Sequence, residues 1–114
     1  MCQIKDKTTR LRRPMIVYKY APNGNCSQFR PQDRSPIKGC VGMGRELRYE
    51  KGRTTHSPSG PGIMAYAKKP YREIRDYIIL RIPRGAVIRR GMDITRPMVA
   101  ASRVVMLGRM ELKR

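Results

Sequence analysis

Acidic residues are scarce in this chain. Eight Asp and Glu residues stand against 26 Lys and Arg residues in a chain of 114, and the formal net charge is +18. Charge of this size destabilises a folded protein by self-repulsion unless counterions or an acidic partner neutralise it. The imbalance therefore predicts a polyanionic partner.

Large aromatic residues and long hydrophobic runs are also missing. The chain has no Trp and a single Phe, Phe29, so a core must come from Ile, Val, Leu, Met and Tyr. The apolar run at 104–107 is far shorter than the roughly 20 residues that a membrane-crossing helix needs. The first residues lack the apolar region of a secretory signal. We expect a protein of the cytoplasm with no membrane partner.

The cysteines do not form a recognisable site. Cys2, Cys26 and Cys40 are odd in number and widely spaced, which argues against a disulfide framework. They and His56 form no closely paired set of zinc ligands. The glycine-rich segment 39–44 lacks the Gly-Lys-Ser/Thr of a phosphate-binding loop. We therefore expect no metal and no other cofactor.

The positive charge lies within segments that look folded. Arg81 stands inside the apolar run 77–82, and Arg103 stands inside 99–105. Arginine dominates, and its planar guanidinium suits bidentate contact with phosphate. We therefore expect nucleic acid, DNA or RNA, as the partner. A competing interpretation is that the arginines only keep the protein soluble.

The patterning predicts an α+β fold, a small and mostly antiparallel β-sheet domain with one short helix and long loops. Residues 1–14 are interpreted as a basic N-terminal arm and residues 15–114 as a single β-rich domain. Alternation and β-branched content predict strands at 15–20, 45–51, 63–66, 77–82, 86–88 and 99–110, the last interrupted by Ser102 and Arg103. A helix is predicted at 70–75, and loops at 21–38 and 52–62.

The predicted contacts with phosphate are the basic residues of the arm, of the helix and of the segment after 86–88. They are Arg10, Arg12, Arg13, Lys68, Lys69, Arg72, Arg75, Arg89 and Arg90. Tyrosines such as Tyr18, Tyr20, Tyr49 and Tyr66 could stack on bases, as proteins that bind single strands require. A preference for single strands is a secondary hypothesis.

A series of short motifs runs along nearly the whole chain. They are Met1-Cys2, Tyr18-Lys19, Ser35-Pro36 with Gly39, Gly44 with Glu46, Gly62-Ile63-Met64, Ile82-Pro83-Arg84-Gly85 and Ala101-Ser102-Arg103-Val104. In this order the set resembles a family of small proteins encoded by phages and large DNA viruses, most without an assigned function. The resemblance implies a virus-encoded accessory protein, located in the host cytoplasm or in a virion. The histidine that the family carries after Gly-Ile is Met64 here.

Two alternatives remain open from the sequence. In the first, the basic face docks onto an acidic protein, as an inhibitor of a host factor or as a virion or capsid component within a larger assembly. In the second, the chain is a small enzyme, because the family layout is similar to a shrunken ADP-ribosyltransferase sheet. Neither Glu73 nor Glu111 is convincing as the catalytic glutamate, so we expect no enzymatic activity.

Overall fold

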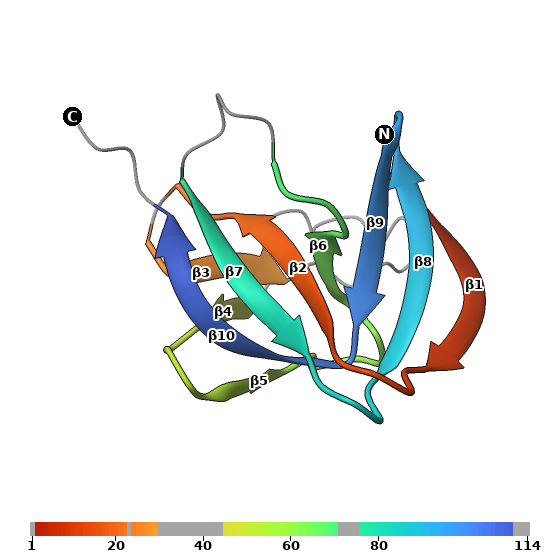
Figure 1. The fold of residues 1–114 in the computed structure, drawn as a ribbon, viewed down its shortest axis with the longest axis horizontal. Helices are drawn as coiled ribbons and strands as arrows, with labels where there is room; N and C mark the ends of the chain where they lie inside the picture. Colours follow the sequence, from red (N-terminus) through yellow and green to blue (C-terminus); the bar gives the residue numbers. More distant parts are fainter. Residues whose placement is uncertain (1, 23, 30–44, 71–75, 111–114) are drawn as a thin grey trace.

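The structure is a computed structural model that describes residues 2–22, 24–29, 45–70 and 76–110. Eight strands form one curled sheet in the order β1-β8-β9-β6-β2-β7-β10-β5, and β3 pairs with β4 in a second, two-stranded sheet (Figure 1). The strand bounds are β1 Cys2–Arg10, β2 Met15–Tyr20, β3 Cys26–Phe29, β4 Arg45–Arg48, β5 Thr54–His56, β6 Ile63–Tyr66, β7 Tyr77–Ile82, β8 Val87–Asp93, β9 Arg96–Ala101 and β10 Arg103–Met110.

The predicted α+β class is wrong, because all regular structure in the described part of the chain is β-strand. The predicted helix at 70–75 falls mostly on residues 71–75, which lie outside the described residues. Three segments that looked too polar or too rich in turn residues also form strands, namely β3 within the loop predicted at 21–38, β5 within the loop predicted at 52–62, and the second half of β8. Each of these segments pairs with a neighbouring strand, and such pairing outweighs weak local β propensity.

Several predicted strands are confirmed. The bounds predicted for β2, β6 and β7 match the observed ones. The interruption predicted at Ser102 and Arg103 is confirmed for Ser102, which separates β9 from β10, and is wrong for Arg103, which begins β10. The three matching segments carry the clearest apolar patterns. Burial alternates along β6, and most residues of β7 are buried, as expected for strands that pack on a core.

The segment expected to be a basic arm is largely a strand. β1 pairs with β8 from Cys2↔Asp93 to Arg10↔Val87, with an irregularity between Ile4 and Thr8. It is an edge strand, and edge positions accept charged side chains because one flank and one face remain in water. Charge along residues 5–10 therefore does not prevent pairing.

The core lies on one face of the curled sheet. Val17, Ile78 and Leu80 are fully buried there, together with Ile88 and Val104 of other strands. Leu47 and Tyr49, from β4 and the residues after it, join the same cluster and cover this face. Since successive strand residues point to opposite faces, the residues between these positions lie on the other side of the sheet, the outer face.

The curled sheet consists of two four-stranded halves that meet at β2 and β6. The register of these two strands contains the single pair Tyr18↔Tyr66. Next to it, the Nζ atom of Lys19 donates to the carbonyl oxygen of Met64 at 2.6 Å. A side chain thus adds a hydrogen bond between strands that share little of a backbone ladder.

Candidate nucleic-acid interface

Two connections pack against each other at one end of the sheet, at the bottom of Figure 1. They are the β1–β2 loop, residues 11–14, and the β7–β8 turn, residues 83–86. The Leu11 amide donates to Ala86 O and the Gly85 amide donates to Leu11 O, both at 2.9 Å. Leu11 and Ala86 are buried, so these bonds hold two surface connections firmly to the core.

The turn needs glycine for its geometry. Its closing hydrogen bond runs from the Ala86 amide to Pro83 O at 3.2 Å, and Gly85 has a φ of 87° at the third position. That is the position at which a type II turn requires positive φ, where a side chain would be strained. The Pro-Arg-Gly sequence therefore forms a tight turn that leaves Arg84 exposed.

Guanidinium groups gather around this turn. Arg10 Nη1 donates to Gly85 O at 2.8 Å, and Arg103 Nη2 donates to Arg84 O at 3.4 Å. Arg12 and Arg13 are exposed in the neighbouring loop. We call this group the arginine end, and it consists of Arg10, Arg12, Arg13, Arg84 and Arg103.

Ser102 brings Arg103 to the turn. The Ser102 amide donates to Val87 O at 2.9 Å, and the Val87 amide donates to Ser102 Oγ at 3.0 Å. These bonds tie the break between β9 and β10 to the first residue of β8. Arg103, the next residue, therefore begins β10 beside the β7–β8 turn.

The arginine end has no ion pair with a carboxylate in the ranges that the structure describes. The described ion pairs are elsewhere: Arg48 with Glu46 at 3.9 Å, Arg53 with Glu50 at 3.2 Å and Arg89 with Asp6 at 3.1 Å.

Strand direction also keeps two aspartates away from the arginine end. Asp76 precedes the first residue of β7 and Asp93 ends β8, whereas the turn between these strands joins their other ends. A guanidinium has five N–H donors, so one bond to a carbonyl orients it and leaves most donors for an anion.

The structure divides the predicted contact residues. Arg10, Arg12 and Arg13 come together, as described. Lys68 and Lys69 are exposed but follow β6 at the opposite end of the sheet, where the Ala67 amide bonds Pro97 O at 3.0 Å. They are about 20 Å from the arginine end, the length of a seven-residue strand such as β8.

Arg89 and Arg90 also differ from the prediction. Arg89 Nε donates to Lys5 O at 2.8 Å and its Nη2 atom bonds Asp6 Oδ1 at 3.1 Å, so this side chain holds β1 against β8. Arg90 is exposed and lies on the other face of β8. Arg72 and Arg75 lie outside the described residues.

Sequence reasoning missed Arg84 and Arg103. Arg84 was noted as part of a turn and Arg103 as a cation at a strand interruption, and neither was predicted to contact phosphate. The two are 19 residues apart in sequence, and the contact between the β7–β8 turn and the start of β10 brings them together. A turn of Pro-Arg-Gly that exposes its central arginine was the available signal.

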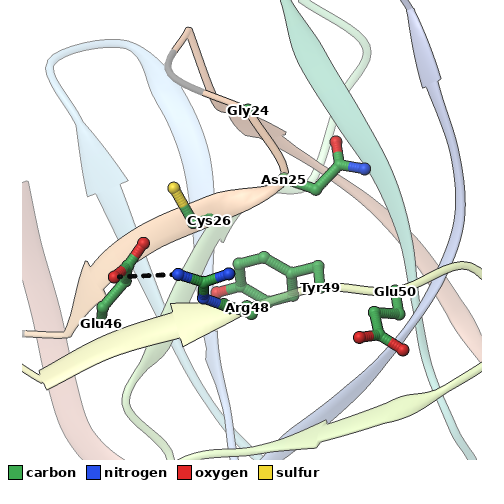
Figure 2. Close-up of a pocket in the computed structure, with 7 residues that line it drawn as sticks. All are labelled: Gly24, Asn25, Cys26, Glu46, Arg48, Tyr49 and Glu50. Atoms are coloured by element: carbon green, nitrogen blue, oxygen red, sulfur yellow. Dashed lines mark ion pairs between the residues drawn. The ribbon is translucent and has the colours of Figure 1, made fainter.

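A second feature is a depression of about 360 Å³ beside β3 and β4, lined by Gly24, Asn25, Cys26, Glu46, Arg48, Tyr49 and Glu50 (Figure 2). Desolvation raises the pKa of the Cys26 thiol, and the hydrogen bond and charge of Glu46 raise it further. The thiolate is the nucleophilic form of cysteine, so this environment works against nucleophilic chemistry.

Comparisons of the chain with protein-family models, with curated proteins and with solved structures found no match. The resemblance to small phage and viral proteins therefore stays a prediction. Among the described residues, no three His, Cys, Asp or Glu side chains gather as metal ligands. In those same ranges, no helix has the length and apolar character for crossing a membrane.

Proposed function

We propose that the protein binds nucleic acid through phosphate contacts and that the arginine end is the principal contact surface. The observation that carries the proposal is the convergence of arginines from separate connections without a carboxylate partner among the described residues. Such an arrangement is electrostatically unfavourable in the isolated protein and becomes favourable beside a polyanion.

The geometry suits phosphate. Bonds to backbone carbonyls orient Arg10 and Arg103 in the free protein, so less side-chain entropy is lost when an anion binds. Planar guanidinium groups offer paired N–H donors to phosphate oxygens. Exposed Arg12, Arg13 and Arg84 add charge at the same end.

The overall charge favours an extended polyanion over a single acidic patch. The formal charge of +18 exceeds what the arginine end alone contributes. Arg81, on the strand that leads into the β7–β8 turn, is a further exposed cation next to it. A nucleic acid carries a continuous row of phosphates and can neutralise cations at successive positions along the surface. If the partner is instead an acidic protein, polyglutamate should compete in the following experiment.

The test is the salt dependence of binding by protein freed of nucleic acid with nuclease and high salt. Labelled single-stranded and duplex oligonucleotides are titrated at salt concentrations from about 50 to about 200 mM, with polyglutamate as the competing polyanion. If each arginine of the arginine end neutralises one phosphate, log affinity falls with log salt with a slope of roughly −3.5 to −4.5. A slope near zero, or competition by polyglutamate at an equal concentration of charge, contradicts the proposal.

A further inference from the structure

Tyr20 is the most exposed tyrosine in the described part of the chain, and 57% of the residue is accessible to solvent. Tyr49 and Tyr77 are buried. Tyr66 is covered by the Arg96 guanidinium, 4.3 Å from its ring centre, and donates its hydroxyl to Asp93 at 2.6 Å. Tyr18 is half-buried and packs edge-on against Tyr77, with ring centres 5.9 Å apart. Among these tyrosines, Tyr20 is the one with a ring that a ligand can cover.

Tyr20 lies on the outer face of three adjacent strands, β2, β7 and β10. Residues paired across antiparallel strands point to the same side, so the register defines this face row by row. The rows are Tyr20-Tyr77-Met110, Tyr18-Ile79-Gly108 and Ile16-Arg81-Val105. We call this surface the Tyr20 face.

Exposed apolar side chains concentrate on this face. Met110 is 44% exposed and belongs to the row of Tyr20. Ile16 is 42% exposed and belongs to the row of Arg81 on the same face. The other large exposed apolar residues of the described ranges, Met92 and Ile94, lie at the far end of β8 and in the turn after it. Strand positions that point away from the core are usually polar. The exposed apolar residues of the Tyr20 face therefore indicate that a partner covers it.

The Tyr20 face runs into the arginine end. Arg81 is exposed in the same row as Ile16. Arg103 lies two residues before Val105 on β10 and therefore points to the same face. Arg103 then reaches the carbonyl of Arg84 in the turn. A strip with the exposed Tyr20 at one end thus leads, at the other, to guanidinium groups that form no ion pair with a carboxylate of the described residues.

We infer that the nucleic acid is single-stranded, with an unpaired base stacked on Tyr20 in the row of Met110, with the strand running along the face past Ile16, and with phosphates held by Arg81 and the arginine end. The inference rests on the proposed function. Bases expose their faces only when they are unpaired at an end or in a single strand, and aromatic rings beside a basic groove are the usual means of holding them. A duplex reaches only the arginines.

The experiment compares binding of an oligothymidylate and of a duplex of equal length by the wild type, Tyr20→Ala and Tyr20→Phe. The control is Ile94→Ala, which removes an apolar side chain that is 82% exposed and lies away from the Tyr20 face. Tyr20→Ala should weaken single-strand binding by roughly 5- to 150-fold, the range for loss of one stacked base. Duplex binding should be unchanged, and Tyr20→Phe and Ile94→Ala should bind like the wild type.

A second measurement does not depend on the stability of Tyr20→Ala. Because the chain has no Trp, Tyr20→Trp introduces a single tryptophan, whose emission can be excited apart from that of the tyrosines, at the predicted stacking position. Oligothymidylate should quench its emission, whereas the duplex should not, and Ile94→Trp should respond to neither. Absence of quenching at saturating oligothymidylate overturns the inference.

The two proposals fail in different ways. If the wild type binds both nucleic acids with the expected salt slope and Tyr20→Ala weakens neither or both alike, single-strand recognition by the Tyr20 face is wrong and phosphate binding stands. If the wild type binds neither, or binds without salt dependence, the proposed function itself is wrong.

Discussion

Lys19 and Met64 are joined where the two halves of the sheet meet. The Lys19 ammonium donates to the Met64 carbonyl at 2.6 Å, beside the Tyr18↔Tyr66 pair. Burial lowers the pKa of Lys19 from 10.5 to about 8. Among the described residues no carboxylate forms an ion pair with this lysine, so the carbonyl dipole is left to stabilise the charge.

We predict that Lys19 makes stability depend on pH. Between pH 8 and pH 10.5 the unfolded chain keeps a proton on Lys19 that the folded protein has released, so the folded state gains stability as pH rises. The full pKa difference corresponds to roughly 3 kcal/mol. Urea unfolding of the wild type and of Lys19→Met at about pH 7 and about pH 10 measures it.

The comparison between the two proteins isolates this lysine, because other titrating groups are common to both. The wild type should gain stability relative to Lys19→Met over this interval. A difference in free energy of unfolding that stays the same at both pH values would show that Lys19 does not lose its proton in the folded protein.

Gly85 holds the arginine end together, and we predict that Gly85→Ala disturbs it. Alanine at a φ of 87° is strained by about 1–2 kcal/mol, and its Cβ would lie 3.4 Å from Arg103 Nη2. The midpoint of thermal unfolding should fall, and affinity for nucleic acid should fall with it. Gly52→Ala is the control, since its φ of 81° imposes similar strain and no atom lies within 4 Å of an added Cβ. Gly52 lies between β4 and β5, outside the turn and the Tyr20 face, so this substitution should lower the unfolding midpoint and leave affinity unchanged. Equal effects of the two substitutions on affinity would refute the special role of the turn.

The sequence predicted the strands whose apolar patterns are strong. β2, β6 and β7 have residues such as Ile78 and Leu80 that are buried in the core. The polar strands β1 and β5 were missed because their stability comes from pairing with β8 and β10, which local composition does not encode. The all-β class was not predicted for the same reason, because it depends on pairing between strands that are distant in sequence.

The candidate site was predicted in part. Arg10, Arg12 and Arg13 are close in sequence, so their proximity required no knowledge of the fold. Arg84 and Arg103 join them only because the break at Ser102 is bonded to the start of β8. Conversely, Lys68 and Lys69 were predicted to contact phosphate because of their charge alone. The strand directions place them at the other end of the sheet.

Arg89 and Arg90 are adjacent in sequence, yet we predict opposite consequences for their removal. Arg89→Ala loses the bonds to Lys5 O and Asp6, which should cost about 1 kcal/mol and increase amide hydrogen exchange in β1. Arg90→Ala removes an exposed side chain and should change stability by less than about 0.5 kcal/mol. Equal exchange in β1 of both variants would contradict a structural role for Arg89.

The most direct test of the arginine end compares two double variants that remove the same charge. Arg12→Ala with Arg13→Ala removes two exposed cations from the arginine end, and Lys68→Ala with Lys69→Ala removes two exposed cations from the opposite end. The measurement is the salt slope of binding to an oligothymidylate, with folding verified by thermal unfolding. The first variant should reduce the magnitude of the slope by about 1.4 and the second should leave it nearly unchanged, because only contacts with phosphate release counterions. Equal reductions in the two variants would show that the protein binds through its net charge and that the arginine end is not a site.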